Sequence, residues 1–351
     1  MRKEKIPLKK LTTVTLKSVA QHVGLTPGTV SAILNDAPSA RAIPPHTKER
    51  VTAAAKELNY RPNYFARSLR RKRNYTIGVI AGEIGGGYGS GIINGVERYL
   101  RGQNYFFLTV AHRHDPELLA SYSNLLVERG VEGFITVNTK LVEPPRLPTV
   151  AIGEHRRLEN VTNIVIDHEL AARLALRHLL DLGHRKIAFM RGHPDSPDAE
   201  DRWHALCKVT REMAVPMNPD LIVQIEIEVG TPHLGYPYAK QLLKCHKPFT
   251  ALFAYNDISA IGAIRAFQEE GLRVPADIAV VGFDDIEGNE FQIPSLTTVR
   301  QPLDQMGQIA AKTLIALIEK TEDCPPQIRI APELVVREST GPVSNGAGKL
   351  H

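Results

Sequence analysis

Residues 15–35 read TLKSVAQHVGLTPGTVSAILN, and this stretch decides the fold of the N-terminal region. Thr15 is a favourable N-cap, and an apolar stripe at helical spacing follows it. Gly24 then supplies the positive φ that a helix C-terminus favours. Thr26 caps a second helix with Pro27 at its first position, where a missing N–H costs nothing. Two short helices joined by a tight glycine turn predict a helix-turn-helix.

An ordinary αα-hairpin shows the same two stripes, so the surrounding composition has to separate the two interpretations. Residues 1–73 hold 16 of the 43 Lys and Arg but only four of the 38 Asp and Glu, a net charge of +12 against −7 for the rest. A third helix, expected over His46–Leu58, completes a compact three-helix unit. A basic head on an acidic body predicts a polyanionic partner, either nucleic acid or an anionic membrane surface.

In a helix-turn-helix the second helix enters the major groove with its N-terminal side chains toward the bases. The outward positions here are Pro27, Gly28, Ser31 and Ala32, and none can make a bidentate contact with guanine or adenine. Ser31 can hydrogen-bond a base or phosphate, and the Ala32 methyl can contact a thymine methyl. Affinity is therefore expected to depend on phosphate contacts and on other elements.

A short basic segment, residues 62–74, follows the head. Asn63 can cap a helix, but so short a helix is unstable alone in water. We expect it to fold on DNA, where phosphates neutralise Arg67 and its basic neighbours. Leu69 is an apolar residue inside this basic helix and can act as a wedge in the minor groove; the alternative is that it packs on a partner subunit.

From residue 75 onward, apolar runs typical of doubly covered parallel strands alternate with helical patterns. Ten strands fit two lobes better than one sheet, so we predict two doubly wound parallel α/β lobes with a ligand crevice at the carboxyl ends of the strands. The predicted strands are Thr76–Ala81, Tyr105–Val110, Gly133–Val137, Thr149–Ile152, Ile164–Ile166, Lys186–Met190, Leu221–Ile225, Thr250–Ala254, Ala279–Phe283 and Leu334–Val336, and the clearest helices are His168–Leu182, Ala199–Met213, Asp257–Glu270 and Leu303–Glu319.

Composition and motifs exclude several classes of protein. With 43% hydrophobic and 23% charged residues a globular core is expected, and no apolar run reaches the ~18 residues of a membrane span. The three distant cysteines and the absence of a secretory signal favour the cytoplasm. The glycine-rich segment after the first strand lacks G-x-G-x-x-G, there is no P-loop or G-x-S-x-G, and the 13 His show no metal-ligand spacing. We therefore expect no catalysis, no cofactor and no metal.

Six stretches, in order, resemble the lactose-repressor (LacI/GalR) family of bacterial transcription regulators. They are residues 15–35, 59–69, 178–188, 255–257, 280–285 and 296–302, and the resemblance covers about residues 14–340. It implies a homodimer bound to a pseudo-palindromic double-stranded DNA operator, with Leu69 of each hinge helix inserted at the operator centre. The DNA-contacting residues it implies are Thr15, Leu16, Thr26, Pro27, Gly28, Thr29, Ser31, Ala32, Asn35, Tyr60, Asn63, Arg67 and Leu69.

The resemblance also implies a domain plan: a DNA-binding head (1–61), a hinge helix (62–74), a core like periplasmic sugar-binding proteins (75–340) and a tail expected to be disordered (341–351). Three crossovers join the core's lobes, placed by alignment at about 75–163 plus 293–323 and 164–292 plus 324–340. The chain lacks the C-terminal leucine heptads that make tetramers, which favours a dimer.

In the cleft, the resemblance places an effector against Arg202, Asn256 and Asp284, with Tyr88 as the one large side chain on a glycine-rich edge. Asp167 is a weaker candidate after another predicted strand, and Asn138 is a further one. A guanidinium fork, an amide and a carboxylate suit a sugar or sugar derivative, and a nucleobase is also possible. The alternatives are that Arg202 makes a surface ion pair with Asp198 or Glu200 and that Asp284 is only a turn residue.

The sequence therefore predicts an effector-controlled transcriptional repressor. Departures from the family pattern, the small side chains at Pro27, Gly28 and Ala32 and a loop about three residues longer at 36–44, leave the operator sequence open. A solute-binding receptor with no DNA role is the competing interpretation, because its core has the same fold. The basic head and the missing export signal argue against it.

Overall fold

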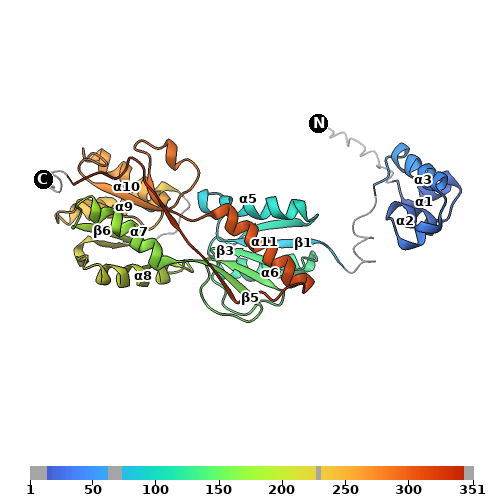
Figure 1. Cartoon of the computed structure of the whole chain (residues 1–351), viewed down its shortest axis with the longest axis horizontal. Helices are drawn as coiled ribbons and strands as arrows, with labels where there is room; N and C mark the ends of the chain where they lie inside the picture. The colour runs from blue at the N-terminus through green and yellow to red at the C-terminus, as the bar shows by residue number, and fades with distance from the viewer. Residues whose placement is uncertain (1–13, 62–72, 227–230, 344–351) are drawn as a thin grey trace, which may run out of the picture. The chain divides into compact units, whose positions relative to one another are not determined.

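The computed structural model describes residues 14–61, 73–226 and 231–343. The chain divides between Asn74 and Tyr75 into two compact units, a headpiece and a core (Figure 1). The predicted hinge helix, with Asn63, Arg67 and Leu69, lies outside the described residues apart from Arg73 and Asn74. Within the described ranges, no helix has the length and apolar character needed to cross a membrane.

The headpiece is a three-helix unit made of α1 (Leu16–Val23), α2 (Pro27–Leu34) and α3 (Pro45–Glu57). Thr15 accepts a hydrogen bond from the Ser18 amide at 3.2 Å, and Thr26 accepts one from the Thr29 amide at 3.1 Å, so both predicted N-caps are present. Gly24 ends α1 with φ 68°. The long loop after α2 forms a 3-10 turn, η1 (Pro38–Ala42). The three helices enclose one apolar cluster: Val19, Ala20, Val23, Val30, Val51, Ala54 and Ala55.

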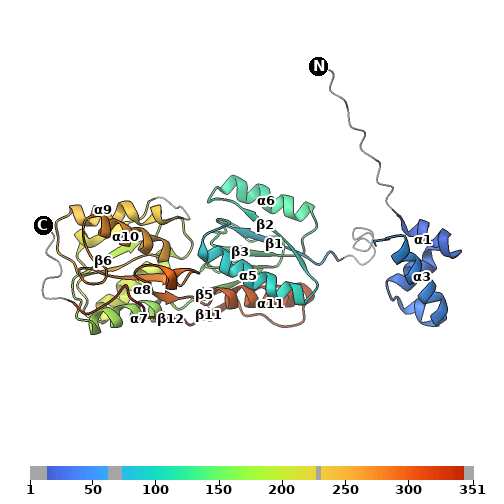
Figure 2. The same cartoon turned by 90° about the horizontal axis from the view of Figure 1, so that it is seen from above.

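The first lobe of the core is a six-stranded parallel sheet in the order β11-β5-β4-β3-β1-β2. Helices α5 (Gly87–Gly102) and α11 (Leu303–Glu319) pack together on one face, and α6 (Pro116–Glu128) covers the other (Figure 2). The strands are β1 (Thr76–Ala81), β2 (Phe106–Ala111), β3 (Phe134–Val137), β4 (Thr149–Ile152), β5 (Val161–Ile166) and β11 (Gln327–Ile330).

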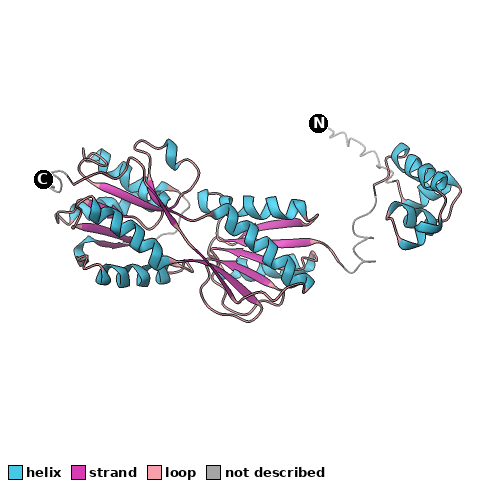
Figure 3. Ribbon diagram, in the orientation of Figure 1, coloured by secondary structure: helices cyan, strands magenta, loops and turns pink. Residues whose placement is uncertain are grey.

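The second lobe, like the first, is a sheet flanked by helices (Figure 3). Its strand order is β12-β10-β9-β8-β6-β7, with only the β10–β12 pair antiparallel. Helices α7 (His168–Asp181) and α8 (Ala199–Glu212) pack as one pair, and α9 (Tyr236–Lys244) and α10 (Asp257–Glu269) as another. The strands are β6 (Ile187–Arg191), β7 (Ile222–Gln224), β8 (Ala251–Phe253), β9 (Ala279–Asp284), β10 (Thr297–Arg300) and β12 (Glu333–Val335), with 3-10 turns η2 (Pro219–Leu221), η3 (Pro232–Leu234) and η4 (Asn289–Phe291).

Strand pairing corrects the lobe boundaries expected from the sequence. All of β5 lies in the first sheet, β10 pairs with β9 in the second, and β11 pairs with β5 in the first. Residues 164–166 and 327–330 therefore belong to the first lobe and 297–300 to the second, the reverse of the expectation. The chain crosses after β5, after β10 and after β11. The sequence does not reveal where the chain crosses between the lobes, because apolar strands occur in both sheets.

The expected disorder of the tail is wrong for its first residues. The Val343 amide donates to the Leu182 carbonyl at 2.9 Å, and the Gly341 carbonyl lies 3.0 Å from Nε2 of buried His184. Residues 341–343 therefore pack on the end of α7, while 344–351 lie outside the described residues.

Candidate functional site

A cleft between the lobes of the core lies at the carboxyl ends of the strands. Segments that follow β1, β2 and β3 line it on the first lobe, and segments that follow β6, β8 and β9 line it on the second. The side chains that matter chemically are polar or aromatic: Glu83, Tyr88, His114, Asn138, His193, Asp198, Arg202, Tyr255, Asn256 and Asp284. The switch-point position predicted from the βα alternation is therefore the one observed.

The first-lobe edge of the cleft is the glycine-rich start of α5. Gly85 and Gly86 have φ of 109° and 68°, values that a side chain would strain, and they bring the backbone to the cleft wall. Tyr88 is half-buried beside them, and its pKa is raised, first by burial and then by the charges of Asp198 and Asp284. Its hydroxyl therefore stays protonated and can donate.

Arg202 is held from three sides in the second lobe. It donates to the Asp198 carboxylate at 2.6 Å and to the Tyr255 carbonyl at 2.7 Å. Its guanidinium carbon lies 3.8 Å from the centre of the Phe283 ring. Among the described residues, its buried Nε has no hydrogen-bond partner, whereas both terminal nitrogens are bonded. Burial by itself raises the pKa of Asp198, but Arg202 holds it at about 2, so the pair is ionic.

Asn256 and Asp284 lie at the carboxyl ends of two adjacent strands: Asn256 follows β8, and Asp284 is the last residue of β9. Asn256 is the N-cap of α10, and its Oδ1 accepts from the Ser259 amide at 2.9 Å. Asp284 is 5% exposed and accepts from the Gln301 amide nitrogen Nε2 at 2.7 Å. Burial is the main cause that raises the pKa of Asp284 well above its ordinary value. Together with Arg202 they offer acceptors and donors at one end of the cleft.

The lobes also touch directly across the cleft. Ser196 of the second lobe donates to Asn138 Oδ1 of the first at 3.2 Å, and the Tyr255 hydroxyl lies 2.8 Å from Ser196 Oγ. The rings of His155 and His168 stack with centroids 5.2 Å apart at the first crossover. A ligand in the cleft, which lies between these contacts, is therefore able to favour one relative position of the two lobes over another.

The predicted effector residues come together with one exception. Tyr88, Arg202, Asn256 and Asp284 line the cleft, but Asp167 does not. It caps α7 instead, accepting from the Leu170 amide at 3.0 Å. The alternative interpretation gave Arg202 a surface ion pair with Asp198 or Glu200; the pair with Asp198 exists, but both residues line the cleft and are largely buried.

Sequence reasoning missed several lining residues. Tyr255 sat in one of the resembling stretches, and Asp198 had the i,i+4 spacing to Arg202, so both carried a usable signal. His114 and His193 carried none, because they reach the cleft only through loops.

On the headpiece, the side chains expected to meet DNA fall into two groups. Thr15, Thr26, Pro27 and Gly28 are exposed, and Thr29 and Ala32 are half-buried. Leu16 and Tyr60 are also half-buried, and part of each side chain packs against the apolar cluster of the headpiece.

The expectation that Ser31 points outward is wrong. It is 9% exposed, and its Oγ accepts a hydrogen bond from Asn35 Nδ2 at 3.2 Å. Asn35 is the C-cap of α2, so this bond lies at the C-terminal end of that helix.

Comparison with known proteins agrees with this architecture. Residues 15–63 match the profile of bacterial regulatory proteins of the lacI family, and residues 176–340 match a periplasmic binding protein-like domain. The HTH-type transcriptional repressor PurR of Haemophilus influenzae is 32% identical over 337 residues, which cover 93% of this chain and 98% of the relative. PurR of Mannheimia succiniciproducens is 31% identical over 334 residues, with the same coverage.

Solved structures agree as well. The Lac repressor dimer bound to operator and the anti-inducer ONPF superposes with a TM-score of 0.83 at 28% identity, covering 94% of this chain and 100% of that one. The complex of the regulator CelR with cellobiose gives 0.68 at 27% identity, with coverage of 93% and 99%. With a relative at 32% identity across almost its whole length, the chain belongs to the LacI family of bacterial regulatory proteins.

Proposed function

We propose that this chain is a repressor that binds a pseudo-palindromic operator as a homodimer. Its affinity for the operator falls or rises when a small polar ligand binds in the cleft of the core. The observation that carries the proposal is the pairing, in one chain, of a capped helix-turn-helix with a cleft that presents Arg202, Asn256 and Asp284. Effector control follows because a ligand that contacts both lobes favours one lobe arrangement over another.

The ligand class follows from the lining. Asp284 can accept from hydroxyls, the Arg202 guanidinium lines the cleft as a donor group, and Asn256 adds an amide, which suits a sugar or a sugar derivative. A nucleobase is the second candidate, because the Tyr88 and Tyr255 rings in the same lining can stack on a planar ring. Solved family members that are similar to this chain contain cellobiose and ribose.

The operator is sought by selecting genomic fragments with the purified protein at about 150 mM salt, which suppresses non-specific binding. We expect a recovered pseudo-palindrome with two half-sites. Recovery of no motif, with binding that fades smoothly as salt rises, contradicts sequence-specific repression.

The ligand is sought by thermal shift of the full chain with D-ribose, cellobiose, hypoxanthine and guanine. A hit that changes the affinity for the recovered operator supports the proposal, and an Arg202→Ala variant should lose that response. The matched control is Arg191→Ala, because Arg191 also pairs with a carboxylate and covers an aromatic ring but lies outside the lining of the cleft. A ligand response unchanged in Arg202→Ala contradicts the assigned cleft.

A further inference from the structure

The loop that leaves β9 carries two adjacent carboxylates in left-handed backbone conformations. Asp284 has φ 120° and Asp285 has φ 58°. The first value is rare for any residue other than glycine, and such a conformation persists only where its surroundings enforce it. Asp284 faces the cleft, whereas Asp285 is absent from its lining and is nearly buried elsewhere. The question is what enforces this turn.

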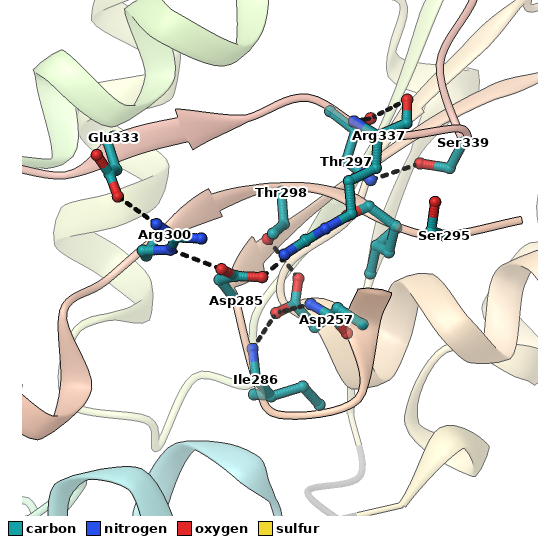
Figure 4. Close-up of polar contacts among 12 residues, drawn as sticks. Asp257, Asp285, Ile286, Ser295, Thr297, Thr298, Arg300, Glu333, Arg337 and Ser339 are labelled. Atoms are coloured by element: carbon teal, nitrogen blue, oxygen red, sulfur yellow. Dashed lines mark hydrogen bonds and ion pairs between the residues drawn. The ribbon is translucent and has the colours of Figure 1, made fainter. Parts of the chain in front are cut away.

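Asp285 is clamped by two arginines (Figure 4). Its Oδ2 accepts from Arg300 Nε at 2.6 Å, and its Oδ1 accepts from an Arg337 terminal nitrogen at 2.7 Å. Arg337 is only 15% exposed and also donates to the Leu296 carbonyl at 2.8 Å. Burial by itself raises the pKa of Asp285, but the bonds from Arg337 and Arg300 lower it, so the carboxylate is ionised.

One of these arginines, Arg300, stands at a point where the chain crosses between the lobes, and the other lies after the last crossing. Arg300 is the last residue of β10, three positions before α11 of the first lobe begins at Leu303. It also bonds Glu333 at 2.5 Å, and Glu333 is the first residue of β12, immediately after the crossing from β11. Arg337 follows β12. Asp285 is thus joined to the chain on both C-terminal crossings.

A second carboxylate, Asp257, anchors the other end of the same loop. Its Oδ2 accepts from the Ile286 amide at 2.9 Å and from Asn289 Nδ2 at 2.7 Å, and its Oδ1 accepts from Thr298 at 2.5 Å (Figure 4). Asp257 also lies outside the lining of the cleft. Each of the effector-facing residues Asn256 and Asp284 is therefore followed directly by a buried carboxylate that holds the backbone.

The anchored loop also contacts the first lobe. A Cβ added to Gly87, the first residue of α5, would overlap the Ile286 side chain, so the two segments lie against each other. Three consecutive residues from the end of β9 onward therefore have three different contacts. Asp284 lines the cleft, Asp285 bonds the arginine at a crossing, and Ile286 lies against the first lobe.

We propose that Asp285 is the positioning residue of the effector site, fixing Asp284 toward the ligand by its two arginine bonds and coupling that orientation to the two C-terminal crossings. It does not touch the ligand. The inference rests on the proposed effector cleft and adds to it the route by which an occupied cleft is sensed at the crossings. Asp257 holds the loop from Ile286 to Asn289, so loss of the clamp releases only the Asp284–Asp285 end.

The test compares the full-length protein with Asp285→Asn, Arg337→Gln and the double variant. Hydrogen exchange at the Gln301 amide, which donates to the Asp284 carbonyl at 3.1 Å, reports the orientation of Asp284 without any ligand. We expect the Gln301 amide to exchange at least tenfold faster in each single variant. The double variant should show no further increase, because the two single substitutions break the same bond between Asp285 and Arg337. Arg300→Gln, at a more exposed position, should show the same change if Asp285→Asn folds poorly.

The matched control is Asp277→Asn, which removes an exposed two-point bond to Arg273 in the same lobe at 2.9 Å. Gln301 exchange within twofold of wild type in the clamp variants, or an equal increase in Asp277→Asn, overturns the proposal. The second readout is affinity for D-ribose, cellobiose, hypoxanthine and guanine, expected to fall at least tenfold in the clamp variants, with ligand-free operator affinity kept within threefold. If the wild type binds none of the four probes, the proposed effector class is contradicted, while the exchange result still decides the role of Asp285.

Discussion

In the cleft, the positions of the charged side chains depend on which group of opposite charge compensates each buried one. Arg202 and Asp198 have side chains only 14% and 11% exposed, and each depends on the other for compensation. Ser196 and Tyr255 hydroxyls near Asp198 supply the remaining contacts, at 3.3 and 3.4 Å. Such a pair fixes the geometry of the site but is costly to break on one side only.

We predict that Arg202→Ala lowers the free energy of unfolding by about 3 kcal/mol, because it leaves the Asp198 carboxylate buried without its cation. Urea denaturation of the isolated variant measures it. Adding Asp198→Asn to Arg202→Ala should recover part of the loss, since the uncompensated charge is then gone. A loss equal to that of Arg191→Ala, which breaks a more exposed pair worth less than about 1 kcal/mol, contradicts this account.

His168 gives a pH dependence with a definite sign. It is 7% exposed, and burial lowers its pKa to about 3, with Arg202 opposing protonation further and Asp198 favouring it. The unfolded chain binds this proton near pH 6.5 and the folded chain does not, so stability is present above pH 6.5 and lost as pH falls toward 3. The slope contributed by one such group is about 1.4 kcal/mol per pH unit.

We therefore expect the free energy of unfolding of the wild type to fall more steeply between pH 6.5 and 4.5 than that of His168→Asn. Denaturant titrations at several pH values measure the two slopes. His204→Asn, at an exposed position on α8, is the control for removing a histidine. Parallel slopes in wild type and His168→Asn show that His168 is not the source.

At the scale of elements, the sequence predicted the apolar strands and helices well and the edges poorly. β1, β4 and α11 have the predicted bounds, because a continuous apolar run or a long amphipathic stripe is a local signal. β10 and β11 were missed, since each mixes polar with apolar residues instead of forming a continuous apolar run, and each is a strand through its pairing with another segment. The clamp on Asp285 was missed for the same reason, because its partners lie 15 and 52 residues away.

The α5–α11 pair depends on glycine in a way that can be measured. A Cβ at Gly95 would overlap the Asp304 carbonyl, and one at Gly307 would overlap the Ile92 carbonyl, so the two backbones touch without side chains between them. We predict that Gly95→Ala costs about 3 kcal/mol of unfolding free energy because the helices must separate. Gly102→Ala, on the same helix with open space around it, should change stability by less than about 1 kcal/mol. Thermal or urea unfolding compares them, and similar losses contradict the close contact.

For the whole molecule, charge carried the clearest signal. The net charge of +12 over residues 1–73 separates a head that binds a polyanion from an acidic core, and the chain divides into two units after Asn74. The cleft was placed correctly from the βα alternation, and four of its lining residues were predicted through the resemblance, but His114 and His193 reach it through loops that no local pattern predicts. The lobe boundaries escaped prediction because apolar strands can enter either sheet.

The division into two units predicts how the activities separate. Residues 75–351 alone should bind the effector and have no operator affinity, because the basic charge and the helix-turn-helix lie in the other unit. In the full chain, the two sites are coupled reciprocally: the factor by which effector changes operator affinity must equal the factor by which operator changes effector affinity.

Calorimetry of effector binding, with and without operator, measures the change in effector affinity. Fluorescence anisotropy of labelled operator, with and without effector, measures the change in operator affinity. For the isolated core, operator DNA should leave the effector affinity unchanged. Operator binding by the core alone, or two unequal factors in the full chain, contradicts a regulator in which the head holds the DNA and the cleft controls it.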